Sequence, residues 1–361
     1  MTYKNPKLVV DSGSLETGAI KWRSPSNIAI IKYWGKYGNQ LPQNPSLSFT
    51  LDNAYTETEF RYEARKGVDK GIALDFYFNG QLNPIFGAKV IKYFEKLVEI
   101  YPFLRQLQMT IYSSNSFPHS AGIASSASAM SALALCLCSF EDSVFGTLSD
   151  DAAFRKKASY LARLGSGSAC RSIYAKASVW GESGEVAGSS NEYAIPFADS
   201  LHPVFQSFHD DILIISKGEK SVSSTVGHGM MDGNIYANNR YQQARQRFHE
   251  LLIALQQGDL EQFGRIAEAE ALTLHALMMT SYPPYILMKP NTLLAIEKIK
   301  VYRQRTGHHL FFSLDAGPNL HLLYPDDVKV EVQSFITNEL SQYCEGGEWI
   351  KDQVGNGPLE S

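Results

Sequence analysis

The chain has 361 residues, of which 44% are hydrophobic and 19% are charged, so it carries enough apolar material for about two globular domains. Its 33 lysines and arginines against 37 aspartates and glutamates give a formal net charge of −4. Proteins that coat nucleic acid or an anionic membrane need a basic surplus, so this balance argues against both partners. A small anionic ligand needs only a local cluster of positive charge, which this composition allows.

The cysteines and the apolar stretches are typical of a soluble, cytoplasmic protein. Cys136, Cys138, Cys170 and Cys344 form no C-x-x-C pair, which argues against a disulfide framework or a zinc ribbon. The N-terminus shows no apolar signal segment. The most apolar stretch, residues 130–140, has about half the length needed to cross a bilayer.

Hydrophobic periodicity predicts alternating strands and helices after an N-terminal extension, residues 1–24. In chain order, the next part is expected to contain strands at 28–31, 48–51 and 74–78, a helix at 88–100, a strand at 109–112, and helices at 125–140 and 150–164. The C-terminal part is expected to contain a strand at 212–216, helices at 241–255, 260–279 and 291–305, and strands at 310–314 and 320–324.

The pattern of the sequence changes between residues 200 and 212, which predicts a domain boundary there. We expect an N-terminal lobe over 25–208 and a C-terminal lobe over 209–361, which close on a shared cleft. Because strands and helices are mixed without regular βαβ repetition, the fold class is α+β.

The stretch Pro118-His-Ser-Ala-Gly122-Ile-Ala124-Ser125-Ser126-Ala127 opens a long helix made of small residues. Small side chains let backbone N–H groups approach an anion, and a helix N-terminus carries about half a positive charge. No Gly-Lys-Ser/Thr follows, so it is not a Walker A loop. Composition alone equally allows a Ser/Ala-rich helix start packed tightly against a neighbouring element.

This stretch resembles the ATP loop of the GHMP kinase superfamily. Four further segments resemble the diphosphomevalonate decarboxylase family within that superfamily, and they lie in the order that the family has. These segments are Asn27-Ile-Ala-Ile-Ile-Lys32-Tyr33-Trp34-Gly35-Lys36, Asn44-Pro-Ser-Leu-Ser48, Gly165-Ser166-Gly167-Ser168-Ala169-Cys170-Arg171-Ser172 and Asp315-Ala-Gly-Pro-Asn319. The resemblance implies a two-lobed GHMP kinase fold, with an N-terminal lobe like ribosomal protein S5 domain 2 and a ferredoxin-like C-terminal lobe.

The same resemblance implies that Asp315 is the catalytic carboxylate, which orients and deprotonates the substrate's 3-hydroxyl for attack on the γ-phosphoryl of ATP. The residues alone favour another interpretation, in which Asp315 is a turn residue that bonds its own backbone. Lys32 would be a catalytic cation paired with Asp315, although a lone lysine at a strand end is usually solvated. Asn27 would anchor the 3-hydroxyl and carboxylate, or act as a cap.

The segment Tyr33, Trp34, Gly35 and Lys36 would grip the substrate's diphosphate. A guanidinium holds a carboxylate with two parallel bonds, so Arg171 would meet the substrate's carboxylate or the 3-phosphate, unless it is a surface residue after a helix start. The rest of this second small-residue segment would contribute to substrate binding, with Cys170 as a packed thiol. Its members are Ser166, Gly167, Ser168, Ala169 and Cys170.

Two further substrate contacts depend on weaker matches. Thr225 follows Ser223-Ser224 and resembles the third residue of a family segment that can contact substrate. Asn238-Asn239-Arg240 stands about where some relatives have Thr-Ser-Arg, so the serine is missing and Arg240 is a candidate diphosphate ligand.

The sequence contains no pattern typical of a metal cage, and Mg²⁺ is expected to arrive with ATP. His308 and His309 are adjacent, so on a strand they would point to opposite faces. His119 and Ser120 stand where relatives often carry Thr-Ala, and an exposed position is expected for His119.

The function that this pattern predicts is ATP-dependent decarboxylation of (R)-5-diphosphomevalonate to isopentenyl diphosphate in the mevalonate pathway. The expected cofactors are ATP and Mg²⁺ bound at Pro118, Gly122, Ala124, Ser125 and Ser126, and the resemblance implies a homodimer. One alternative is a kinase of the same fold that phosphorylates mevalonate or phosphomevalonate without loss of CO₂. Another is a catalytically silent binding or regulatory protein of this fold.

Overall fold

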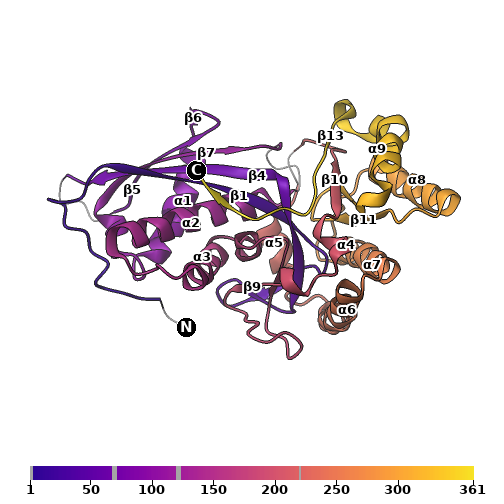
Figure 1. The fold of residues 1–361 in the computed structure, drawn as a ribbon, viewed down its shortest axis with the longest axis horizontal. Coiled ribbons are helices and arrows are strands. Elements are labelled where there is room, and N and C mark those ends of the chain that lie inside the picture. The colour runs from indigo at the N-terminus through magenta and orange to yellow at the C-terminus, as the bar shows by residue number, and fades with distance from the viewer. Residues whose placement is uncertain (1–2, 67–70, 119–122, 219–220) are drawn as a thin grey trace.

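Two sheets organise residues 3–66, 71–118, 123–218 and 221–361, the part of the chain that the computed structural model describes. The larger has eight strands and lies in the N-terminal lobe, and the smaller has four strands and lies in the C-terminal lobe (Figure 1). Helices α1–α3 cover the first sheet, and helices α6–α9 gather around the second. The expected two-lobed α+β fold is confirmed.

The large sheet has the strand order β14-β1-β4-β7-β5-β6, with β8 joined to β4 and β9 joined to β8. All of its pairs are antiparallel except β5 with β7. Its strands are β1 (Gly18–Ala29), β4 (Ser46–Ala64), β5 (Ala73–Phe78), β6 (Gln81–Leu82), β7 (Leu107–Asn115), β8 (Ala177–Trp180), β9 (Ala194–Pro196) and β14 (Leu359–Glu360). The short strands β2 (Lys36–Tyr37) and β3 (Leu41–Pro42) form a separate hairpin.

Strand β1 corrects the expectation that residues 1–24 are an extension, because residues 18–24 already pair with β4. Charged residues hide this part of the strand from a hydrophobicity pattern. They lie at the sheet surface, where Lys21 forms an ion pair with Glu57 at 2.7 Å and Arg23 stacks on the ring of Tyr55. The pairing register shifts between Pro25 and Asn27, and the strand ends two residues before the expected Ile31.

Helices α1 and α3 of the N-terminal lobe begin at side-chain caps. Asp150 caps α3 by accepting a hydrogen bond from the amide of Ala153. Helix α2 has the length and hydropathy of a membrane span, but 61% of that stretch is buried inside the lobe, as in a core helix. The bounds are α1 (Pro84–Leu97), α2 (Ser125–Phe145) and α3 (Asp151–Gly165), with the 3₁₀ segments η1 (Pro102–Arg105), η2 (Gly167–Ile173) and η3 (Ala198–Ser200).

The C-terminal lobe is built on the antiparallel sheet β11-β12-β10-β13, and α7 packs along β11. Strand β10 begins at His209, three residues earlier than expected. Its polar start is buried because each side chain has a partner, such as His321 for Asp210 at 2.8 Å. The strands are β10 (His209–Leu213), β11 (Phe311–Leu314), β12 (Leu320–Tyr324) and β13 (Trp349–Ile350). The short helix α4 (Pro203–Gln206) precedes this lobe. The helical segments of the lobe are α5 (Ser224–Gly229), α6 (Ala237–Gln257), α7 (Leu260–Met279), α8 (Pro290–Thr306), η4 (Asp326–Val328), α9 (Lys329–Phe335), η5 (Ile336–Leu340), η6 (Ser341–Tyr343) and η7 (Glu345–Gly347).

The C-terminal segment crosses back from the second lobe to the first (Figure 1). The carboxylate of Asp352 accepts hydrogen bonds from the amides of Asp52, Asn53 and Ala54 at 2.7–2.8 Å. Beyond it, β14 pairs with β1 at the edge of the large sheet. Asp352 and Gln353 also bond to β10, so they link the two lobes, and the residues after them lie on the N-terminal lobe although the sequence division assigns them to the second.

Candidate active site

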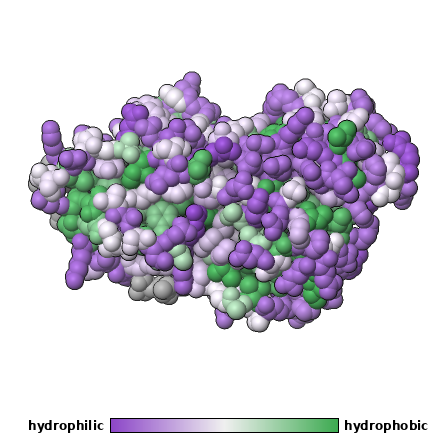
Figure 2. All heavy atoms as spheres, in the orientation of Figure 1, coloured by the Kyte–Doolittle hydropathy of each residue, from purple (hydrophilic) through white to green (hydrophobic). Residues whose placement is uncertain are grey.

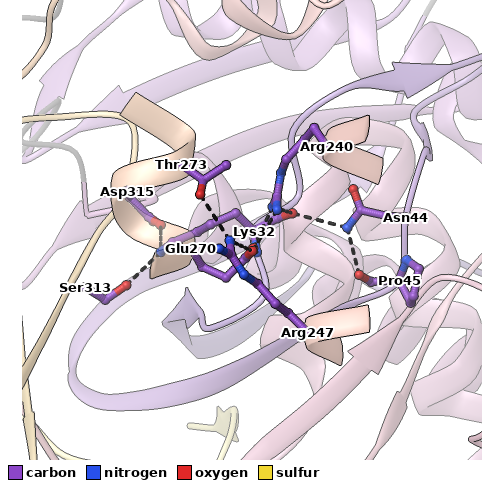
Figure 3. A network of polar contacts seen from close by, with 9 residues as sticks. All are labelled: Lys32, Asn44, Pro45, Arg240, Arg247, Glu270, Thr273, Ser313 and Asp315. Carbon is purple, nitrogen blue, oxygen red and sulfur yellow. Dashed lines mark hydrogen bonds and ion pairs between the residues drawn. The ribbon is translucent and has the colours of Figure 1, made fainter. Parts of the chain in front are cut away.

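The centre of the candidate site is an ion pair that joins the two lobes (Figure 3). Lys32 follows β1 in the N-terminal lobe, and its side chain extends to the other lobe. Its Nζ donates to Asp315 Oδ1 at 3.1 Å and to Ser313 Oγ at 2.9 Å. Both acceptors lie in the C-terminal lobe, on β11 and directly after it. The Lys32 side chain is 2% exposed and that of Asp315 is 21% exposed, so the carboxylate is the partner that solvent reaches.

The main chain of Lys32 is held by side chains rather than by a neighbouring strand. Its amide donates to Glu270 Oε2 at 2.9 Å, and its carbonyl accepts from Asn44 Nδ2 at 3.3 Å and from Arg240 at 3.4 Å. Glu270 lies on α7 and is fully buried. In Figure 3 these side chains surround the Lys32 peptide on the side away from Asp315.

Arg240, which the sequence predicts to be a diphosphate ligand, instead binds a carboxylate of its own chain. It is buried on α6, and its two terminal nitrogens donate to Glu270 at 2.7 and 2.5 Å. Arg247 adds a third bond to the same carboxylate at 2.9 Å. A buried carboxylate needs such partners, so Arg240 belongs to an internal ion pair.

The electrostatics of this centre are set by burial and by opposite charges. Burial lowers the pKa of the Lys32 ammonium, whereas the charges of Asp315 and Glu270 act against that shift. For Glu270, burial pushes the pKa upward, but the charge and hydrogen bonds of Arg240 and Arg247 outweigh it and leave the pKa below its usual value. The site therefore contains compensated charges in a place that excludes most water.

Arg171 and Asn27 form a second polar group beside this pair. Arg171 is buried, donates to Ser46 Oγ at 2.8 Å and lies within 3.4 Å of Asn27 Oδ1. Asn27 in turn donates to Ser172 Oγ at 2.8 Å and to the Ser168 carbonyl at 3.2 Å. Burial lowers the pKa of Arg171 and the charge of Asp315 opposes this, so the guanidinium lies within electrostatic reach of that carboxylate. The alternative that Arg171 is a surface residue is therefore wrong.

The segment from Tyr33 to Lys36 packs around His228, which the sequence analysis did not identify. The imidazole contacts the rings of Tyr33 and Trp34 at centroid distances of 4.4 and 4.6 Å, and its Nδ1 accepts from the Gly35 amide at 3.1 Å. Burial, with the charges of Lys36 and Arg171, lowers the pKa of His228 to about 3. His228 is therefore a neutral imidazole at physiological pH.

Two glycines are required by these close contacts. Gly35 has φ of +98°, and a Cβ there would lie 2.2 Å from the Tyr241 hydroxyl. A Cβ on Gly167 would lie 2.8 Å from the Tyr33 hydroxyl. The segment at 166–170 thereby packs against the Tyr33 ring. Cys170 is a buried thiol, and burial raises its pKa to about 12, which agrees with a packed cysteine. Lys36 donates to Gln40 Oε1 at 2.8 Å.

The expected phosphate loop meets the same region at the start of α2. Ala124 has the left-handed conformation, φ 45° and ψ 38°, and among the described residues no side chain caps the first turn. Ser126 is exposed and its hydroxyl lies 3.2 Å from that of Ser166, so the loop and the 166–170 segment adjoin. Pro118 and Ser125 are partly buried. Gly122 and His119 lie outside the described residues.

Thr225 is exposed on α5, whose Gly227 packs so closely on Trp34 that a Cβ would lie 2.6 Å from the indole. The helix therefore borders the Tyr33–Lys36 segment. His308 and His309 are both engaged elsewhere, His308 with Tyr302 and His309 with Glu261. No group of three His, Cys, Asp or Glu residues within the described ranges could hold a metal ion.

Comparison with known proteins agrees with this geometry. Residues 24–193 match the model of the diphosphomevalonate decarboxylase-like N-terminal domain, and residues 211–356 match that of the mevalonate 5-diphosphate decarboxylase C-terminal domain. Diphosphomevalonate decarboxylase of Candida albicans is 27% identical over 87% of this chain and 86% of its own length.

Solved structures give the same result. The crystal structure of mevalonate diphosphate decarboxylase from Staphylococcus aureus is 27% identical, with a TM-score of 0.80 over 96% of this chain and 98% of that one. A complex of MDDEF with MVAPP, AMPPCP and magnesium is 28% identical, with a TM-score of 0.78 over 96% of this chain and 99% of the other. Sequence motifs, both family models and the two-lobed fold thus agree, and the chain belongs to the diphosphomevalonate decarboxylase family of the GHMP kinase superfamily.

Proposed function

We propose that this chain catalyses the ATP-dependent decarboxylation of (R)-5-diphosphomevalonate to isopentenyl diphosphate, ADP, phosphate and CO₂. The observation that carries the proposal is the Lys32–Asp315 pair, which brings a carboxylate and an ammonium from the two lobes to one point in a chain of this family. Both matching family models are those of decarboxylases, so the kinase alternative is not favoured.

Asp315 would accept the proton of the substrate's tertiary 3-hydroxyl while that oxygen bonds to the γ-phosphorus of ATP and ADP leaves. Phosphoryl transfer relies more on position and charge than on early proton removal, so a carboxylate serves as the base. The exposed fifth of the Asp315 side chain gives a hydroxyl access, and the bond from Lys32 fixes the orientation of the carboxylate.

Lys32 and Arg171 would stabilise the second half of the reaction. The C3–O bond breaks with loss of phosphate, and the electron pair of the C1–C2 bond then forms the C2=C3 double bond as CO₂ departs. Two buried cations near Asp315 can offset the negative charge that develops on the departing phosphate. Asn27 would keep Arg171 in place through the contact at its Oδ1.

The residues at the start of α2 fit the phosphates of ATP. Within the described part of the chain the first turn has no side-chain cap, which leaves backbone N–H groups for an anion, and the hydroxyls of Ser125 and Ser126 add donors. ATP with Mg²⁺ would supply the phosphoryl group there, as the relatives' complexes suggest. On the substrate side, the Tyr33–Lys36 segment would bind the diphosphate, with Ser166, Ser168 and Thr225 as further contacts.

The test measures CO₂ and ADP together with mevalonate, its 5-phosphate and its 5-diphosphate as substrates. We expect CO₂ release to require both ATP and the 5-diphosphate. Asp315→Ala should lower turnover by at least 10³-fold while nucleotide binding survives, and the exposed Asp327→Ala in the same lobe should keep wild-type turnover. ADP formation without CO₂ would support a kinase, and an active Asp315→Ala enzyme would refute the assignment of the base.

We also propose that the protein works in the cytoplasm as a homodimer. All four cysteines are buried free thiols, which suits a reducing compartment. Figure 2 shows a mainly hydrophilic face broken by apolar patches, and large apolar side chains remain exposed in the C-terminal lobe, such as Ile235, Tyr282 and Ile286. Sedimentation equilibrium of the purified protein tests the dimer, and fractionation of cells tests the location.

A further inference from the structure

We infer that Glu270 is a positioning residue, which holds the Lys32 peptide so that the Lys32 ammonium meets Ser313 and Asp315. The inference rests on the role of Lys32 in the proposed function. Neither the sequence motifs nor the comparisons assign a role to Glu270.

The geometry shows how one carboxylate can fix this lysine. After β1 ends at Ala29, the amide of Ile30 still bonds to the Leu47 carbonyl, but the Lys32 amide has Glu270 Oε2 as its acceptor at 2.9 Å. The Lys32 carbonyl accepts from Asn44 and from Arg240. The peptide is thus fixed at both ends by side chains, and the direction of the lysine side chain follows from that of its peptide.

Glu270 is itself held rigidly, which a positioning group requires. Arg240 binds both of its oxygens, and Arg247 binds Oε1 at 2.9 Å while also donating to Thr273 Oγ1 at 3.0 Å. The carboxylate is fully buried, so without these two cations it would be too costly to keep charged. The two arginines come from α6 and Glu270 from α7, so two helices of the C-terminal lobe fix a loop of the N-terminal lobe.

Glu270 also contributes to the charge balance at Lys32. The charged groups that act on Lys32 are Asp315 after β11, Glu270 on α7 and Asp210 on β10, and His321 on β12 interacts with the Lys32 charge in turn. Arg240 and Arg247 on α6 bind the Glu270 carboxylate, and Arg171 in η2 interacts with Asp315. The negative charge of Glu270 favours the protonated lysine, in the same direction as those of Asp315 and Asp210. Removal of this charge leaves Arg240 and Arg247 unneutralised, and both then disfavour the ammonium.

The test compares Glu270→Gln with wild type in the CO₂ assay across pH 6–10. We expect kcat to fall about tenfold or more, because an error of about 1 Å at a reacting group costs up to about 100-fold. The KM for ATP should stay within about twofold. The alkaline limb of the kcat–pH profile should move to lower pH by about one unit in Glu270→Gln, because Lys32 loses its proton more easily.

Arg247→Gln is the matched control, because it breaks a bond to the same carboxylate but leaves the Glu270–Lys32 contact and removes a positive charge. Its alkaline limb should not move to lower pH, even if the protein is equally destabilised. A folded Glu270→Gln enzyme with wild-type kcat and pH profile would overturn the inference, as would the same downward shift in Arg247→Gln.

Glu270→Asp keeps the charge but shortens the reach, so it should keep the wild-type alkaline limb with a reduced kcat. It decides the matter if Glu270→Gln does not fold, since a wild-type kcat in Glu270→Asp would contradict positioning. Lys32→Met separates this inference from the proposed function. Turnover by Lys32→Met would refute the role of Lys32 itself, whereas an inactive Lys32→Met beside an unaffected Glu270→Gln would refute only the role of Glu270.

Discussion

The two partners of the Lys32–Asp315 ion pair are buried to different degrees, and this predicts different costs for losing each of them. The Lys32 side chain is 2% exposed and that of Asp315 is 21% exposed. Loss of the Asp315 carboxylate leaves the Lys32 ammonium without its anion in a place that water does not reach. Loss of the lysine leaves a carboxylate that solvent can still hydrate.

The magnitudes follow from this difference. Asp315→Asn keeps a hydrogen-bond acceptor but no charge, so Lys32 faces only neutral groups at its Nζ, and we expect a loss of about 3 kcal/mol in unfolding free energy. Lys32→Met removes the buried ammonium together with its desolvation cost, so we expect a loss of about 1 kcal/mol or less. Urea unfolding of both variants, followed by tryptophan fluorescence at pH 7, measures the difference.

The pH dependence has a defined sign. Burial lowers the pKa of Lys32 in the folded protein, and loss of Asp315 lowers it further because that charge opposes the shift. Between this folded pKa and the ordinary value of 10.5 the unfolded chain binds more protons, so the stability of Asp315→Asn should rise with pH over that interval, by at most about 1.4 kcal/mol per pH unit. Lys32→Met should lack this rise. Equal losses in the two variants at pH 7, or no recovery of Asp315→Asn as the pH is raised to 10.5, would refute the reasoning.

Three further predictions concern other parts of the fold. His228 is neutral in the folded protein, with a pKa of about 3. The free energy of unfolding should therefore fall as pH drops from 6.5, by up to about 1.4 kcal/mol per pH unit. Urea unfolding should show a weaker fall in the His228→Asn variant. Gly35→Ala forces a Cβ against the Tyr241 hydroxyl at a positive φ, and steady-state kinetics should show the KM for the diphosphate raised at least tenfold while that for ATP is kept. Lys157→Met strands Glu141, the other half of a buried pair at 2.5 Å, and should cost about 3 kcal/mol in thermal unfolding without a change in either KM.

Much of the fold could be predicted where apolar periodicity is long and uninterrupted. The helix at 260–279 and the strand at 320–324 match α7 and β12 at both ends. Periodicity failed where polar residues are paired across the sheet. Lys21 in β1 and Asp210 in β10 read as loop residues, but Glu57 and His321 provide the partners that make them compatible with a strand.

The site divides in the same way. Lys32, Asp315, Arg171 and Asn27 come from local motifs, and the structure brings these four residues together. Glu270 contacts a residue 238 positions away, and no local pattern identifies it. Arg240 shows a related limit, because a sequence cannot say whether a guanidinium meets a substrate anion or a buried carboxylate of its own chain.

The return of residues 351–361 to the first lobe has a consequence for how the chain acquires its structure. On the ribosome the N-terminal lobe emerges first, but its edge strand β14 and the Asp352 carboxylate, which binds the amides of residues 52–54, are synthesised after the second lobe. The first lobe therefore cannot complete its sheet until the second has been synthesised. Expression of residues 1–208 alone should give a lobe with an open edge at β1, which is prone to pair with another chain. Addition of a peptide of residues 351–361 should protect that edge.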